Sequence, residues 1–172
     1  MVVENNYYED IQRIWKENNH GYISYGSNQK ALHDEKMRQF VWRENEQTLA
    51  YAIVYEGSDF CEKDEYPNQI QNMPKKVAYI WEIVTDKNHV GKGIGGKLLD
   101  YIITKYQDYT LYSCIDITNV PSLKLHEKKG FSVLYQFEKA EKNKTNSHVM
   151  MERIPTNGCQ KKFKKEWLAK KQ

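Results

Sequence analysis

The sequence predicts a mixed α/β fold, with helices flanking one central and mostly antiparallel sheet. Apolar residues recur at helical spacing near the N-terminus, β-branched and aromatic runs mark strands, and a glycine-rich segment joins a strand to a helix. The chain has 172 residues, of which 40% are hydrophobic and 28% charged, which suits one globular domain with its own core. We expect this domain to span residues 1–154.

Two helices are expected in the first forty residues. Residues 7–18 carry apolar side chains at helical spacing. A second helix is predicted to begin near residues 27–28, where Ser or Asn can cap it, and to run through Leu32, Met37 and Phe40. The first part of the chain therefore reads as helical.

Strands follow these helices. Residues 47–56 are β-branched and aromatic, which predicts a buried strand. A weaker strand at residues 39–43 is expected to pair with it across a turn at residues 44–46. Residues 57–76 are rich in Gly, Asp, Glu, Asn and Pro and are interpreted as a long loop, a feature that is often functional in compact domains.

The second half of the chain alternates strands and helices. Gly130 is well placed to end the second of its helices, because glycine tolerates the positive φ of a helix C-terminus. The predicted elements are a strand at 76–85, a helix at 97–106, a strand at 110–117, a short helix at 121–129, and two closing strands at 131–139 and 147–154.

A glycine-rich turn is the most informative segment. It follows the strand that ends near Thr85 and opens a helix, so main-chain N–H groups and the positive end of the helix dipole converge on one point. Glycine is required where a Cβ would keep a phosphate away from the main chain. We therefore expect an anion, most simply a pyrophosphate, to bind at Gly91, Lys92, Gly93, Gly95 and Gly96.

Two nucleotide-binding patterns also fit this turn. Residues 91–96 satisfy G-x-G-x-x-G, the dinucleotide fingerprint, and Asp116 lies at a suitable distance to meet a ribose. However, strands of antiparallel character precede the turn, whereas a Rossmann unit is built from parallel strands. Residues 91–97 also fit G-x-x-x-x-G-K, but Leu98 stands where a P-loop needs Ser or Thr to hold magnesium.

A third pattern accounts for more of the chain. The run from Glu82 through Val90-Gly-Lys-Gly-Ile-Gly-Gly-Lys97 resembles the acetyl-CoA motif of the GNAT superfamily of N-acetyltransferases, and Asn119-x-x-Ser-Leu-Lys-Leu-His-Glu-Lys-Lys-Gly-Phe131 resembles its second signature. The resemblance covers roughly residues 47–153. It implies a GNAT-like acyl-CoA N-acyltransferase fold and acetyl-CoA as cosubstrate, with no metal. The chain departs from the pattern at Val90, where Arg or Gln is usual, and at His126, where many members have Tyr.

The resemblance also assigns residues to the acetyl-CoA site. The pantetheine arm would lie along Ile83, Val84 and Thr85, and Asn119 would contact it from the neighbouring strand. A main-chain N–H of this strand could polarise the thioester carbonyl. The pyrophosphate would lie on the glycine turn, where Val90 leaves the binding to main-chain donors and to nearby lysines.

Two side chains are candidates for proton transfer. Glu82 is an acid in an otherwise apolar strand, and we interpret it as the general base, acting directly or through water; the alternative is a solvent-facing residue of an alternating strand. His126 is the candidate proton donor to the leaving thiolate, with packing over the cofactor as the alternative. A non-catalytic acyl-CoA-binding module on the same fold also stays open.

The remaining features concern partners and location. The acceptor amine has no recognisable code, so small-molecule and protein amines both stay open, as does a homodimer. Residues 155–172 contain six Lys and one Glu, which contributes +5 to a net charge of +3. We interpret this tail as a solvated terminal helix rather than a nucleic-acid or membrane contact. The N-terminus has no signal-peptide pattern, so we expect a cytoplasmic protein. Three separated cysteines predict neither zinc nor disulfides.

Overall fold

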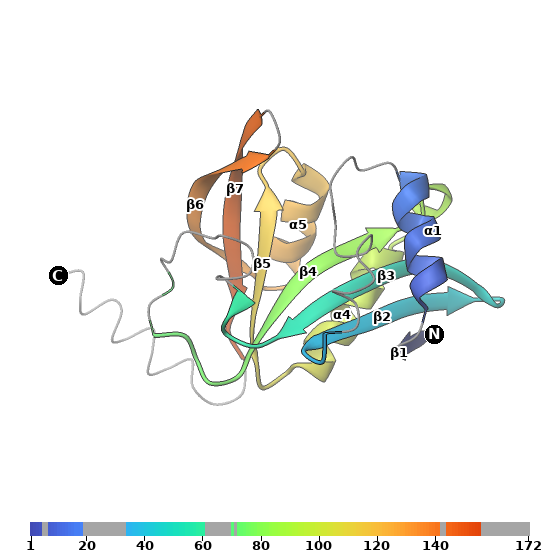
Figure 1. The fold of residues 1–172 in the computed structure, drawn as a ribbon, viewed down its shortest axis with the longest axis horizontal. Coiled ribbons are helices and arrows are strands. Elements are labelled where there is room, and N and C mark those ends of the chain that lie inside the picture. Colours follow the sequence, from blue (N-terminus) through green and yellow to red (C-terminus); the bar gives the residue numbers. More distant parts are fainter. Residues whose placement is uncertain (5–6, 19–33, 61–69, 71, 142–143, 156–172) are drawn as a thin grey trace.

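The computed structural model describes residues 1–4, 7–18, 34–60, 70, 72–141 and 144–155. These residues form a central sheet with α1 on one face and α4 and α5 on the other (Figure 1). The elements in chain order are β1 (Val2–Glu4), α1 (Tyr8–Asn18), β2 (Met37–Glu44), β3 (Gln47–Glu56), β4 (Val77–Thr85), the short 3-10 helix η2 (Lys87–His89), α4 (Ile94–Lys105), β5 (Thr110–Asp116), α5 (Val120–Lys128), β6 (Ser132–Glu141) and β7 (Lys144–Arg153).

The sheet confirms the predicted fold class. Its seven strands lie in the order β1-β2-β3-β4-β5-β7-β6. Neighbouring strands are antiparallel except β4 and β5, which are parallel and joined through α4. A single parallel pair does not make the doubly wound sheet on which the dinucleotide interpretation depends, so that interpretation is wrong for this fold.

The β2–β3 hairpin confirms one strand prediction and corrects a helix prediction. Asn45 and Glu46 adopt φ angles of 48° and 66°, the pattern of a tight two-residue hairpin turn. The helix predicted to run through Met37 and Phe40 is wrong at these positions, because both residues lie in β2. Their spacing of three fits a helix face, but in the strand they point to opposite faces and enter different cores.

Each face of the sheet has its own core. On one face, Ile11 and Ile14 of α1 pack on aromatic residues of β3 and β4. On the other, α4 presents four buried apolar residues to the sheet: Ile94, Leu98, Leu99 and Ile102. The alternation of strand side chains supplies both cores, and the sheet thereby holds α1 and α4 on opposite sides of the β4 end.

The other predicted elements are confirmed with small shifts in their ends. α4 begins at Ile94, three residues earlier than expected, because the helix starts within the glycine turn. Gly130 follows α5 with a φ of 85°, as its predicted role requires. β1 was not predicted. The start of the predicted second helix, residues 61–69 of the predicted loop and residues 156–172 of the tail lie outside the described residues.

Candidate active site

β4 separates from β5 halfway along its length. The two strands pair only from Val77 opposite Thr110 to Ile80 opposite Ser113. Beyond Ile80, β4 remains paired with β3 alone as far as Thr85. Figure 1 shows the two strands diverging toward their C-terminal ends. The second half of β4 therefore has an edge with no neighbouring strand among the described residues.

The register shows which main-chain groups face this open edge. The N–H of Asp86 donates to the carbonyl of Leu49 at 2.8 Å, and Val84 lies opposite Tyr51. In an antiparallel ladder the main-chain groups of alternate residues point toward and away from the partner strand. Val84 is therefore bonded to β3, whereas the N–H and C=O groups of Ile83 and Thr85 point to the side from which β5 has diverged.

A β-bulge places Glu82 on the α1 face. Ile53 lies opposite Glu82, and Val54 lies opposite Ile80, which leaves Trp81 as an extra residue in β4. The extra residue shifts the alternation, so that the side chains of Trp81 and Glu82 lie on the same face. Glu82 is half-buried, and the hydroxyl of Tyr51 donates to its Oε2 at 2.9 Å. The predicted base is thus held by a specific partner beside the open edge.

The first two glycines of the turn are required by main-chain conformation. Gly91 and Gly93 have φ angles of 83° and 76°, which non-glycine residues rarely adopt. A Cβ added at either position would meet nothing within 4 Å. Gly93 caps α4, and the N–H groups of the first helical turn, beginning at Ile94, have no acceptor within the helix. These donors and the helix dipole are the features on which the predicted anion site depends.

The last two glycines of the turn have a packing role. A Cβ at Gly95 would lie 3.0 Å from Oγ1 of Thr85, and one at Gly96 would lie 3.4 Å from Cδ1 of Leu125. Glycine therefore lets α4 approach the end of β4 and α5 closely. The same contacts bring the glycine turn, the open β4 edge and α5 together at one end of the molecule.

The side chains around the turn differ in their exposure and in their contacts. Val90 is 68% exposed, and Lys92 is also exposed. The ammonium of Lys97 lies 5.5 Å from the ring centroid of Trp42, a cation–π contact on the side of β2. The positive potential at the turn therefore comes from the ammonium of Lys92 and the partial charges of the main-chain N–H groups. Lys97 adds charge nearby, but its ammonium also contacts Trp42.

Asn119 and His126 belong to α5. Asn119 is the N-cap of the helix, and its Oδ1 accepts from the N–H of Ser122 at 3.2 Å. It follows the end of β5 by three residues, so it lies at the start of a helix rather than in the strand where it was expected. Its side-chain NH₂ is the group with which it can contact a ligand.

His126 is 3% exposed and packs edge-on against Phe131. Its Nδ1 lies 2.9 Å from the carbonyl oxygen of Ser122, and because a carbonyl only accepts, Nδ1 must carry the proton. Burial lowers the pKa of His126, so the ring is neutral at pH 7 and Nε2 is an acceptor. This state argues against donation of a proton to a thiolate; packing over the cofactor stays a prediction.

The sequence matches the model of the acetyltransferase (GNAT) family over residues 5–131. The chain belongs to the GNAT family. That match includes the glycine turn, both proton-transfer candidates and the Asn119 cap. None of the curated proteins matches the sequence.

Solved structures share the GNAT fold at low sequence identity. The ribosomal-protein-S18-alanine N-acetyltransferase of Escherichia coli superposes with a TM-score of 0.70 at 15% identity, covering 92% of this chain and 95% of that one. Arabidopsis thaliana NAA60, solved with a bisubstrate analogue, gives 0.69 at 11% identity, with 92% and 100% covered. The Salmonella typhimurium protein yncA, solved with its cofactor acetyl-CoA, gives 0.64 at 18% identity, with 91% and 95% covered. These likenesses establish the fold.

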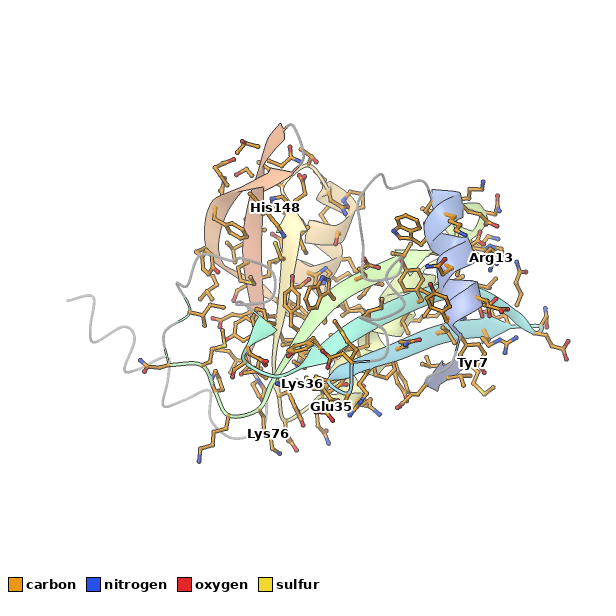
Figure 2. The ribbon with its side chains drawn as sticks, in the orientation of Figure 1. Tyr7, Arg13, Glu35, Lys36, Lys76 and His148 are labelled. Atoms are coloured by element: carbon orange, nitrogen blue, oxygen red, sulfur yellow. The ribbon has the colours of Figure 1, made fainter. Side chains whose placement is uncertain are left out.

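Sequence reasoning missed the residues that fix α1 to the candidate site. Asp86 is only 1% exposed and accepts from Nη1 of Arg13 at 3.0 Å and from the N–H of Asn88 at 2.8 Å. Burial alone would raise the pKa of Asp86, but the N–H of Asn88 and the Arg13 guanidinium hold it below the ordinary value. Arg13 reaches from α1 (Figure 2) and also donates to the Thr48 carbonyl at 2.8 Å.

Only one half of this connection could be recognised from the sequence. Asp86 precedes residues 87–89 as a typical helix-capping residue, which the sequence does show. Its partner Arg13 lies 73 positions away, and nothing in the sequence links the two. The turn that follows β4 is thus anchored to the helix on the opposite side of the sheet.

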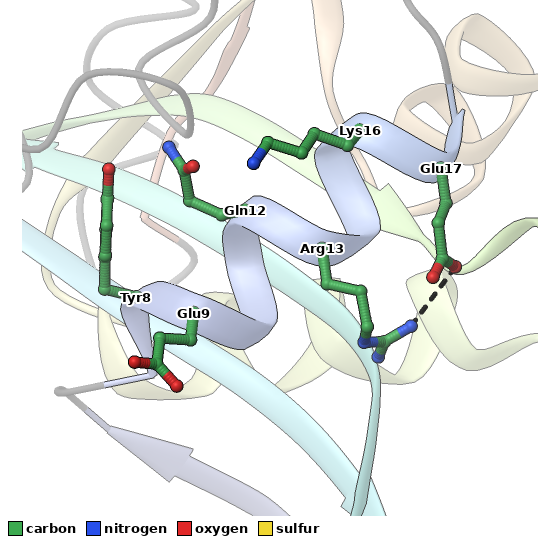
Figure 3. Close-up of a pocket in the computed structure, with 6 residues that line it drawn as sticks. All are labelled: Tyr8, Glu9, Gln12, Arg13, Lys16 and Glu17. Atoms are coloured by element: carbon green, nitrogen blue, oxygen red, sulfur yellow. Dashed lines mark hydrogen bonds and ion pairs between the residues drawn. The ribbon is translucent and has the colours of Figure 1, made fainter.

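A pocket of about 450 Å³ lies elsewhere, over the outward side of α1 (Figure 3). None of its described lining residues is a sequence-predicted site residue: Tyr8, Glu9, Gln12, Arg13, Lys16 and Glu17. Arg13 and Glu17 bond to each other along the helix at 3.2 Å. The candidate site is therefore identified by the main-chain groups at the open edge of β4, Glu82 and the glycine turn, and not by this pocket.

Other ligand classes find less support in the described residues. The Asp116 carboxylate, proposed to meet a ribose, accepts from the N–H and hydroxyl of Thr118 and so stabilises the β5–α5 turn. The described part of the chain contains no cluster of three His, Cys, Asp or Glu residues that could hold a metal ion. It also contains no helix long and apolar enough to cross a bilayer.

Proposed function

We propose that the protein transfers the acetyl group of acetyl-CoA to a primary amine by direct attack in a ternary complex. The open edge of β4 carries this proposal, because Ile83 presents an N–H and a C=O to the side where no strand follows. The pantetheine arm of acetyl-CoA contains amide groups, which can pair with such an edge as an added strand does.

The glycine turn supplies the second half of the cosubstrate site. A pyrophosphate at the start of α4 would accept from the N–H groups of the first helical turn, and the left-handed Gly91 and Gly93 keep side chains away from it. Asn119 would contact the arm through its NH₂ group. The acetyl-CoA complex of yncA, a protein of the same fold, supports this assignment.

Deprotonation of the amine and stabilisation of the oxyanion then each have a residue. Glu82 takes a proton from the ammonium of the acceptor, directly or through water, so that the neutral nitrogen can attack the thioester carbon. The Ile83 N–H faces the open edge and would stabilise the negative charge that develops on the carbonyl oxygen. The C–N bond forms, the C–S bond breaks, and the second proton of the amine neutralises the thiolate. A thiol with a pKa of about 8.5 is a good leaving group, so His126 is not needed as a donor.

Turnover separates this proposal from the non-catalytic acyl-CoA-binding module. Glu82→Gln removes the base but keeps the shape of the side chain and its acceptor for Tyr51. We expect kcat to fall by about a hundredfold or more, with acetyl-CoA affinity unchanged. Glu127→Gln, an exposed change on α5, is the matched control. Acetylation that is equally fast in Glu82→Gln would remove Glu82 from the mechanism, and acetyl-CoA binding without turnover on any amine would favour the binding module.

A further inference from the structure

Two polar atoms near the end of α1 are buried without hydrogen-bond partners among the described residues. They are Nε1 of Trp15 and Oδ1 of Asn18. A buried polar atom left unpaired destabilises the folded protein, and such atoms are uncommon in native structures. Two of them within one helical turn therefore require an explanation.

Both side chains lie on the face of α1 that is turned toward the sheet. Positions 15 and 18 are three residues apart and share a helix face. Trp15 packs against the same core as Val84. Asn18 is fixed more directly, because its Nδ2 donates to the carbonyl of Thr85 at 2.7 Å. Asn18 thus borders the C-terminal end of β4, and Trp15 lies one turn earlier on the same face of α1.

The hydrogen-bonding character of each atom is fixed. The indole Nε1 can only donate. In Asn18, the bond to the Thr85 carbonyl must come from the NH₂ group, so the unpaired atom is the oxygen, which can only accept. The two buried atoms are therefore one donor and one acceptor, with side-chain origins roughly 5–6 Å apart.

We propose that Trp15 and Asn18 bind an amide group of the acceptor, so that the substrate is an amine whose carbon skeleton also carries an amide. This inference rests on the proposed acetyl transfer. An amide satisfies both atoms, since its C=O accepts from Trp15 and its N–H donates to Asn18. A carboxylate or an ester would leave Asn18 unpaired, and a plain alkylamine would leave Trp15 unpaired.

The position of the pair suits this role. The side chain of Glu82 lies on the α1 face of β4, three residues before Thr85, which is a distance of about 10 Å along the strand. An acceptor bound by its amide at the end of α1 can extend along β4 and bring its amine to Glu82. Peptides and aminoacyl amides have this arrangement of groups, whereas simple polyamines do not.

The test compares Trp15→Phe with the wild type on matched acceptors. An α-amino series consists of alanine N-methylamide, alanine methyl ester and isopropylamine. A second series consists of the N-methylamide and the methyl ester of 6-aminohexanoic acid, together with hexylamine. The ratio of wild-type to variant kcat/KM is measured for each substrate, so that differences in amine basicity cancel. Trp42→Phe is the matched control, since its indole donates to Glu44 at the surface.

We expect Trp15→Phe to lower kcat/KM roughly tenfold for the amide and ester of at least one series, and less than twofold for the alkylamines. Asn18→Leu also loses the hydrogen bond to Thr85, which should lower kcat/KM for every substrate. A larger fall in kcat/KM for the amide than for the ester would measure the contribution of Oδ1. Trp42→Phe should show no dependence on the substrate.

Three results would overturn the inference. An equal loss on all acceptors would make Trp15 structural. A tenfold weaker dissociation constant for acetyl-CoA in Trp15→Phe would place the pair against the pantetheine amides instead. Acetyl-CoA binding by the wild type with no preference for amides over alkylamines would refute amide recognition while leaving acetyl transfer intact. Absence of acetyl-CoA binding would refute the proposed function itself.

Discussion

The buried carboxylate of Asp86 joins α1 to the segment that leads into the glycine turn, and its removal should destabilise the fold measurably. In Asp86→Ala, the N–H of Asn88 and one contact of Arg13 lose their acceptor, and Nδ1 of His89 loses a partner at 3.3 Å. Arg13 keeps its bonds to Glu17 and Thr48 and is 34% exposed, so the cost is smaller than for a fully buried ion pair. Two charge-assisted hydrogen bonds amount to about 3 kcal/mol.

Thermal unfolding at pH 7 measures this loss. About 3 kcal/mol corresponds to a fall in Tm of roughly 6–12 °C for a chain of this size. Asp100→Ala is the control, because Asp100 is 55% exposed in its ion pair with Lys129 and should cost less than about 1 kcal/mol. A Tm within about 2 °C of the wild type for Asp86→Ala would refute the argument that this contact anchors the turn.

The same substitution has a predictable pH dependence. The pKa of Asp86 is lowered in the folded state, so its contribution to stability is present above the unfolded pKa of about 3.9 and is lost as the pH falls through the folded value. The difference in stability between wild type and Asp86→Ala should therefore not decrease between pH 7 and pH 5 and should shrink below about pH 4. A difference that shrinks between pH 7 and 5 would contradict a charged Asp86.

Two further predictions concern the turn and α5. Gly93→Ala should lower the stability by about 1–2 kcal/mol because of the positive φ, and it should also weaken acetyl-CoA binding. Gly130→Ala is the control: its φ is similar but it lies outside the turn, so it should lower the stability as much without changing the affinity for acetyl-CoA. Equal effects of the two substitutions on this affinity would contradict the anion site. Because burial lowers the pKa of His126, the unfolded chain binds its proton more readily, and wild-type stability should fall as the pH drops below the unfolded value of about 6.5. His126→Phe should lack that component in Tm measurements; parallel curves for the two proteins would mean that His126 binds a proton as readily in the folded as in the unfolded chain.

Local patterns predicted much of the fold. The strand at residues 47–56 and the first helix were recognised because their periodicity is strong and their neighbours in sequence are turn residues. The error at Met37 and Phe40 arose because a spacing of three fits a helix, and only pairing with β3 shows that a strand forms there. β1 is three residues long, and its pairing with β2 is likewise a distant contact.

In the candidate site, too, local features could be predicted and contacts between distant segments could not. The glycine turn and Glu82 lie within sixteen residues of sequence, so a motif could reveal them. The face on which Glu82 points depends on the bulge at Trp81, which strand alternation alone does not predict. The contacts of Arg13 with Asp86 and of Asn18 with Thr85 join segments far apart in the chain, and only the fold brings them together.

Thermal stabilisation by acetyl-CoA, with NAD and ATP in parallel, tests the central claim most directly. At a hundred times its dissociation constant, a ligand of the folded state adds about 2.7 kcal/mol, a shift of several degrees in Tm. The account predicts that acetyl-CoA stabilises the wild type and that NAD and ATP do not. Stabilisation by NAD or ATP alone, or by none of the three, would contradict the assignment of the β4 edge and the glycine turn to acetyl-CoA.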